Sequence, residues 1–230
     1  MSNEQHKKYI AIFDIDGTVF RSALMTQLHL ALVREGIFPK KTNEIIKPKL
    51  QAWLDRRGSY RVYIDTMVKV FKDNIIGKKQ SDILRVSHKV IEEQKNRVYT
   101  YTTNLIKKIR KTHLLVAISG SSIEIVREFN KYWKFDHVYG EILEVEDGVY
   151  TGKIVVEPIL DKKVLVEAFI DAHHLSLKGS IGVGDTESDI SFLEIVAEPI
   201  CFNPNSHLYV VAKKKGWKVV VERKDVIYEL

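Results

Sequence analysis

Two features are scarce or absent in this chain of 230 residues: cysteine and long apolar runs. The single cysteine, Cys201, excludes an internal disulfide and favours a reducing compartment, the cytoplasm. No apolar run approaches the ~18 residues of a membrane-spanning helix. The polar N-terminus leads directly into an apolar run and lacks the cleavage site of a secretory signal. We therefore expect a cytoplasmic globular protein with no membrane partner.

Positive charge is in excess, with 36 Lys and Arg against 30 Asp and Glu and a net charge of +6. Such a balance can attract nucleic acid or phosphorylated substrates. The densest basic clusters, at 107–111 and 213–218, fall near expected helix ends, where cations interact favourably with the helix dipole. We therefore expect no nucleic-acid partner. Binding to nucleic acid remains an alternative, and steep salt dependence would reveal it.

Short apolar runs alternate with amphipathic stretches along most of the chain. The expected strands are 7–15, 113–119, 179–185, 197–202 and 216–221. The expected helices between them are 121–133, 161–175, 188–196 and 205–215. This alternation predicts an α/β fold, a doubly wound parallel sheet with helices on both faces. Ligands of such sheets bind outside the carboxyl ends of the strands.

Two segments depart from this alternation. Residues 20–100 contain helical patterns and no convincing strand, so we expect an inserted α-helical cap. The catalytic core is then expected to comprise 1–19 and 101–230. At 138–156, Asp147-Gly148 separates two alternating runs, which indicates a hairpin because Gly accepts positive φ.

The first expected strand ends in two aspartates, Asp14 and Asp16, just before Gly-Thr. Carboxylates with this spacing point the same way while the strand lasts, and their charges repel. A metal site is one interpretation of the pair, and a nucleophile with an acid/base partner is another. The third is a solvated turn, because Asp-Gly-Thr is also favourable turn chemistry.

Polar residues at the other strand ends favour a site. Ser119 and Gly120 end a strand just before an expected helix, whose free N–H groups suit an anion. Asp185 ends another strand, and Asp189 follows four residues later. Carboxylate oxygens of this kind suit Mg²⁺. Lys162, at the start of a helix, can bring a positive charge to the same edge.

These motifs together resemble the signatures of the haloacid dehalogenase-like hydrolases. The matching elements are, in order, DIDGT (14–18), SGS (119–121), Lys162 and GDTESD (184–189). The helical insertion after the first signature is similar to the cap of the phosphoserine phosphatase-like branch. The resemblance covers nearly the whole chain and implies a Rossmann-like core with that cap.

The resemblance implies a role for each aspartate of the first signature. Asp14 would attack phosphorus and form an aspartyl-phosphate. Asp16 would protonate the leaving oxygen and then deprotonate the attacking water. The dehalogenases of the family lack this general acid, so Asp16 favours phosphoryl transfer.

The resemblance also implies a cofactor, Mg²⁺. It would be held at Asp14, Asp16 (through its backbone carbonyl), Asp185 and Asp189, the last through water or by orienting Lys162. Ser119, Gly120 and Lys162 would bind the phosphate. Lys163 is adjacent to Lys162, and the spacing to Asp185 favours Lys162 as the active-site lysine.

The substrate is less well defined by the sequence. Phosphoserine phosphatases place a glutamate shortly after the first signature to bind the substrate amine, and Ala23 occupies that position here. Arg21, Arg56 and Arg57 are candidate substrate contacts, because Arg suits a carboxylate or a second phosphate. Solvated arginines are the alternative. His173 and His174 lack the partner spacing of a zinc site.

The function predicted from these observations is Mg²⁺-dependent hydrolysis of a small phosphorylated metabolite, a phosphomonoester. Two alternatives stay open: a phosphotransferase with the same intermediate, and a non-catalytic scaffold that binds a phosphorylated ligand. The oligomeric state is not defined by the sequence.

Overall fold

The computed structural model describes residues 9–230 and contains a single mixed sheet. Its strands are β1 (Tyr9–Asp14), β2 (His113–Ser122), β3 (His137–Glu146), β4 (Val149–Val156), β5 (Ile181–Gly184), β6 (Glu198–Phe202), β7 (Lys218–Arg223) and β8 (Val226–Glu229). The order across the sheet is β4-β3-β2-β1-β5-β6-β7-β8. The six strands from β3 to β7 in this order are parallel, and β4 and β8 pair antiparallel at the edges.

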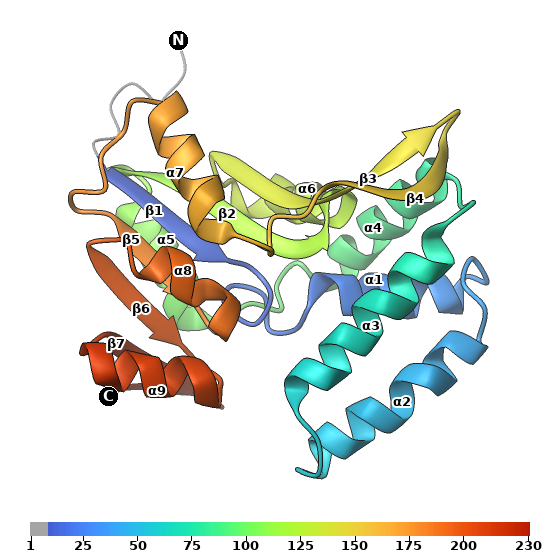
Figure 1. Ribbon diagram of the computed structural model, residues 1–230, viewed down its shortest axis with the longest axis horizontal. Coiled ribbons are helices and arrows are strands. Elements are labelled where there is room, and N and C mark those ends of the chain that lie inside the picture. Colours follow the sequence, from blue (N-terminus) through green and yellow to red (C-terminus); the bar gives the residue numbers. More distant parts are fainter. Residues whose placement is uncertain (1–8) are drawn as a thin grey trace.

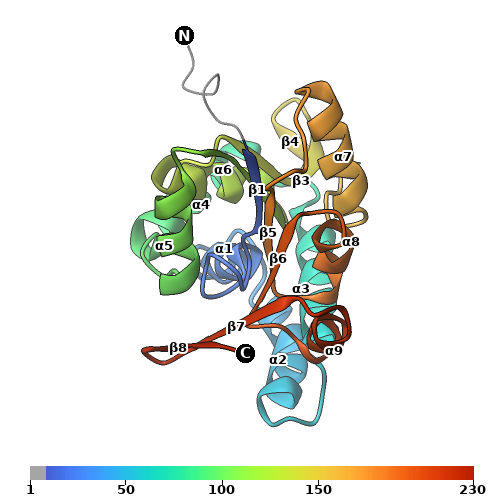
Figure 2. The same cartoon turned by 90° about the vertical axis from the view of Figure 1, so that its left-hand side faces the viewer.

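Helices cover both faces of this sheet, as the doubly wound prediction requires (Figure 2). One face carries α1 (Leu24–Arg34), α4 (Gln80–Gln94), α5 (Thr100–Ile109) and α6 (Ile123–Trp133). The other carries α7 (Lys162–Ala172), α8 (Ile190–Leu193) and α9 (Ser206–Lys215). Successive side chains of β1 point to opposite faces of the sheet. Phe13 packs into the large hydrophobic cluster on one face, and Ile12 packs into a second cluster on the other. The predicted fold class is therefore confirmed.

A pair of helices, α2 (Lys41–Leu54) and α3 (Tyr60–Ile75), projects beside the sheet (Figure 1). The two helices share a small hydrophobic cluster of Ile46, Tyr63, Met67 and Val70. Helices α1 and α4 contribute to the large cluster under the sheet, as do Phe71 and Ile75 at the end of α3. The assignment of residues 20–100 to a separate cap domain stays a prediction.

Two hairpins close the edges of the sheet. Asp147 and Gly148 both have positive φ, 49° and 78°, as a two-residue turn between β3 and β4 requires. The sequence pattern did not predict β8, whose four residues are all exposed and therefore carry no alternation of burial.

The helix expected at 188–196 is shorter than predicted. The chain forms a 3₁₀ turn, η2 (Glu187–Asp189), before α8, because the Asp189 side chain bonds the backbone of the preceding loop.

The expectation that the chain lacks a secretory leader concerns residues 1–8, which lie outside the described part of the chain. Among residues 9–230, no helix is both long enough and apolar enough to cross a bilayer.

Candidate active site

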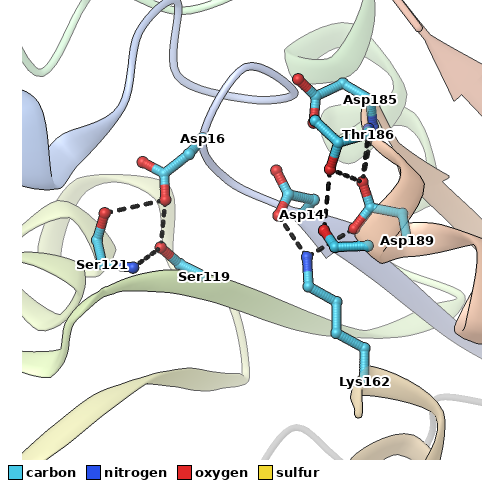
Figure 3. A network of polar contacts seen from close by, with 9 residues as sticks. Asp14, Asp16, Ser119, Ser121, Lys162, Asp185, Thr186 and Asp189 are labelled. Carbon is cyan, nitrogen blue, oxygen red and sulfur yellow. Dashed lines mark hydrogen bonds and ion pairs between the residues drawn. The ribbon is translucent and has the colours of Figure 1, made fainter. Parts of the chain in front are cut away.

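The predicted aspartates and Ser119 gather at the carboxyl ends of β1, β2 and β5, and Lys162 reaches them from the start of α7 (Figure 3). Strand β1 lies between the other two, and the strand order reverses at this point. The chain proceeds from β1 to one side through β2 and β3, and to the other through β5 and β6. Crevices at such reversals are the usual ligand sites of open α/β sheets.

A buried lysine links two of the aspartates. The Lys162 ammonium donates to Oδ1 of Asp14 at 2.7 Å and to Oδ1 of Asp189 at 2.6 Å. The side chain is 1% exposed, because α7 begins at this residue and directs it under the sheet edge. Lys163 instead lies at the surface, 3.8 Å from Glu167. Of the two adjacent lysines, Lys162 therefore reaches the site.

Three carboxylates lie close enough together to hold a cation. One oxygen each from Asp14, Asp185 and Asp189 falls within a common distance of 4.8 Å. Oδ2 of Asp14 is buried and has no hydrogen-bond partner among the described residues. Carboxylate oxygens gathered this closely suit a hard divalent cation such as Mg²⁺.

Electrostatics favour the same conclusion. Burial raises the pKa of Asp14 from 3.8 to about 8, and the charges of Asp189 and Asp16 add to this rise, although Lys162 opposes it. Burial, followed by the charges of Asp14 and Asp189, also raises the pKa of Asp185. Negative charge at the site thus exceeds what one lysine neutralises. A bound cation would relieve this excess and favour the ionised carboxylates.

Asp189 has both carboxylate oxygens occupied. Oδ1 accepts from Lys162, and Oδ2 accepts from the backbone N–H groups of Asp185 at 2.9 Å and Thr186 at 3.0 Å. The side chain therefore fixes the lysine and the loop after β5 at the same time. A Cβ at Gly184 would lie only 2.5 Å from the Asp189 side chain, so this arrangement depends on glycine there.

Asp16 lies on the side of the site away from Lys162 (Figure 3). Its Oδ2 accepts from the hydroxyls of Ser119 at 2.5 Å and Ser121 at 3.0 Å, and its Oδ1 accepts from the Leu24 N–H at 2.5 Å. Burial raises the pKa of Asp16, while these hydrogen bonds partly counteract the rise. The Ser121 hydroxyl also accepts from the Met25 N–H at 2.9 Å, a contact that was not predicted. The place of Ser121 in the SGS signature and just before the helix suggested at most an N-cap, whereas the N-cap of α6 is Ser122.

The expected phosphate-binding loop lies directly beside these groups. Gly120 is partly exposed and lines a cavity of about 130 Å³ together with Asp14, Asp16 and Asp185. A Cβ at Gly120 would lie 3.1 Å from Ile159, so glycine keeps the loop open to the cavity. Helix α6 begins three residues later.

The cavity is roofed by α3. Tyr60, Ile64, Met67 and Val68 of this helix line it opposite the aspartates. Burial, together with the charges of Asp185 and Asp16, raises the pKa of Tyr60. The phenol therefore stays protonated in the cavity that the aspartates line.

The three arginines expected near the substrate are not among the described residues that line this cavity. Arg21 borders an outer cleft and lies over the Tyr99 ring, 5.5 Å from its centroid. Arg56 lines a groove near Trp53, and Arg57 is exposed and pairs with Asp55 at 2.5 Å. Ala23 does line the cavity, so no carboxylate enters from that position.

The adjacent histidines lie on the surface. The His173 ring stacks on Phe169 with a centroid distance of 4.1 Å, and His174 follows with a φ of 53°. Both side chains are exposed, which fits an ordinary helix end.

Comparison with known proteins identifies the family. The sequence profile of the haloacid dehalogenase-like hydrolases matches residues 11–194. The chain belongs to this family. The inserted helices and the doubly wound core agree with its phosphoserine phosphatase-like branch, the resemblance that the sequence motifs indicated.

Two phosphatases of known name are similar in sequence, one over part of the chain and one over nearly all of it. Phosphoserine phosphatase SerB1 of Mycobacterium tuberculosis is 28% identical over 82 residues, 35% of this chain. The match spans only 27% of that relative's length. Histidinol-phosphatase of Neisseria meningitidis serogroup C is 21% identical over 230 residues, covering 93% of this chain and 98% of the relative.

Among solved structures, a phosphoserine phosphatase with a phospho-aspartyl intermediate analogue is similar in fold. Its TM-score is 0.61 at 17% identity, with 95% of each chain covered. At this level of sequence identity, the similarity shows only that the two proteins share a fold.

Proposed function

We propose that this protein is a Mg²⁺-dependent phosphatase that hydrolyses a small phosphomonoester through an aspartyl-phosphate at Asp14. The observation that carries the proposal is the unpartnered, buried Oδ2 of Asp14, whose other oxygen is held by Lys162. One oxygen is thus fixed and the other is left for chemistry. The names of the phosphatase relatives support the same reaction class.

Asp14, Asp185 and the backbone carbonyl of Asp16 would hold the Mg²⁺, and Asp189 would position Lys162. The cation would supply positive charge against the phosphoryl oxygens, which otherwise repel the nucleophile. Lys162 contributes a second positive charge at the nucleophile itself.

In the first half-reaction, Oδ2 of Asp14 attacks phosphorus and the bond from phosphorus to the leaving oxygen breaks. Asp16 gives its proton to that oxygen, and its raised pKa suits the task because it favours the protonated form. Water attacks phosphorus in the second half-reaction and returns a proton to Asp16, which releases phosphate and the Asp14 carboxylate. Ser119 and the Gly120 N–H would hold the phosphoryl oxygens throughout.

The first test replaces the nucleophile. Asp14→Asn keeps the shape of the side chain but removes its charge, and we expect phosphate release from a panel of phosphomonoesters to fall by about 10⁴-fold or more. Asp171→Asn, an exposed position on α7, is the matched control and should retain wild-type turnover. Turnover in Asp14→Asn equal to wild type, or activity indifferent to EDTA, would refute the mechanism.

A further inference from the structure

Glu141 is a buried acid that the proposed chemistry does not use. It lies on β3, next to Ser122 of β2 in the strand register, and is 2% exposed. One carboxylate oxygen, Oε2, is 2.6 Å from the Lys72 ammonium. The other, Oε1, is buried and has no hydrogen-bond partner within residues 9–230. Glu141 lines the same cavity as Asp14 and Asp16.

The surroundings of Glu141 carry an excess of negative charge. Lys72 also pairs with Glu157, at 2.7 Å, and Glu157 lines the cavity as well. Glu124 is 5% exposed and accepts from the Tyr150 hydroxyl at 2.8 Å. Burial raises the pKa of Glu141, and the charges of Glu157 and Glu124 raise it further against the effect of Lys72. One lysine is therefore shared by two carboxylates, and a third buried carboxylate adds to the negative charge around Glu141.

The position of Glu141 relative to the nucleophile defines the ligand that would fit. Strands β1, β2 and β3 are neighbours, so β1 and β3 lie about 10 Å apart across two strand spacings, and Glu141 lies two residues beyond Tyr139, the β3 residue level with Asp14. The cavity wall that continues from one end to the other is largely apolar: Met25, Ile64, Met67, Val68 and Ile159. The expected phosphate-binding groups lie at one end, and the carboxylates of Glu141 and Glu157, which share a single lysine, lie at the other.

We propose that Glu141, with Glu157, binds a cationic group on the leaving alcohol, so that the substrates are short phosphomonoesters bearing an organic ammonium. This inference rests on the proposed phosphatase function and adds the substrate class. Oε1 of Glu141 accepts the hydrogen bond of the ammonium, while Lys72 holds the two carboxylates together. The acid thus comes from the third strand of the sheet, because Ala23 provides none beside the first signature.

The test compares substrates that differ only in charge. We would measure kcat and KM for 2-aminoethyl phosphate against propyl phosphate, and for 3-aminopropyl phosphate against butyl phosphate. Each pair replaces an ammonium by a methyl group of similar size. The wild-type protein should favour the charged member at least tenfold in kcat/KM, and Glu141→Gln should reduce that preference at least tenfold, mainly through KM.

The matched control is Glu144→Gln on the same strand, where the carboxylate pairs with Lys153 at 2.7 Å away from the cavity-lining residues. It should keep the wild-type preference. Thermal unfolding of each variant reports on folding. If Glu141→Gln does not fold, Glu157→Gln carries the test, and we expect about a threefold loss of preference because its side chain is more exposed.

The outcomes separate the two proposals. Equal kcat/KM for charged and neutral members in the wild type overturns the cationic subsite and leaves the phosphatase intact. An unchanged preference in a folded Glu141→Gln, or in Glu157→Gln where that variant carries the test, has the same meaning. Absence of phosphate release from every ester, in the presence of Mg²⁺, overturns both.

Discussion

The carboxyl edge of the sheet and the helical pair α2 and α3 are stabilised by different kinds of contact. At the edge, the charged groups are buried and tied to one another: Lys162 is 1% exposed and bridges two carboxylates. In α2 and α3, four residues make up the buried cluster and most charged side chains face solvent. The proposed chemistry thus depends on groups whose positions are fixed by several partners. Phe71 and Ile75, near the end of α3, pack into the large cluster and tie the helical pair to the core.

The strongest test of this difference removes the buried lysine. Lys162→Met leaves Asp14 and Asp189 without their shared cation, and we expect kcat to fall by about 10²–10³-fold. Lys163→Met is the control, since Lys163 is partly exposed and should change kcat less than twofold. Steady-state phosphate release measures both. Similar effects of the two substitutions would contradict the view that the edge alone carries the chemistry.

The second test uses the pH dependence of stability in metal-free protein. With its pKa raised from 3.8 to about 8, Asp14 holds a proton in the folded state that the unfolded chain releases. Folded protein therefore loses stability as pH rises through this window. Asp14→Asn cannot titrate, so its stability relative to wild type should grow by about 1–3 kcal/mol between pH 5 and 7.5.

Urea unfolding in EDTA at the two pH values measures this difference. Added Mg²⁺ should reduce it, because a cation favours the ionised Asp14 of the wild type. A difference that is constant with pH would show that Asp14 is already ionised in the metal-free protein.

The smallest effect is expected at the contact between α3 and the loop that follows β5. Arg61 of α3 pairs with Glu187 of η2 at 3.0 Å, and the Arg61 side chain is largely exposed. Exposed ion pairs contribute about 0–1 kcal/mol and are screened by salt. We expect Arg61→Met to raise KM at most threefold at low ionic strength, with no effect at high salt.

The control for this test is Arg57→Met. Arg57 pairs only with Asp55 in the contacts described, within the same helical pair, and its loss should leave KM unchanged. A salt-independent change in Arg61→Met would assign Arg61 to substrate binding instead.

The parts that the sequence predicted share a simple origin. Asp14, Ser119 and Asp185 follow apolar runs, and parallel strands bring such ends to one edge, so local pattern and topology suffice. The resemblance to the family then gave these residues their proposed roles.

What the sequence did not predict depends on contacts between distant residues. Glu141 is distinguished by its burial and by Lys72 of α3, and neither is visible in the alternation of β3. Likewise, α1 and α4 have the periodicity of any amphipathic helix. Only the structure shows that both pack into the large cluster under the sheet.

Gly17 connects the two loops that carry the aspartates. Its φ is 83°, its N–H donates to the carbonyls of Phe20 and Ser22, and a Cβ there would overlap Oδ2 of Asp185. The loop after β1 is therefore shaped to fit a carboxylate from β5, far along the chain. A protein engineer who grafted the first signature alone onto another sheet would transfer half of a fitted pair. The transplantable unit is both loops with the strands that set their separation.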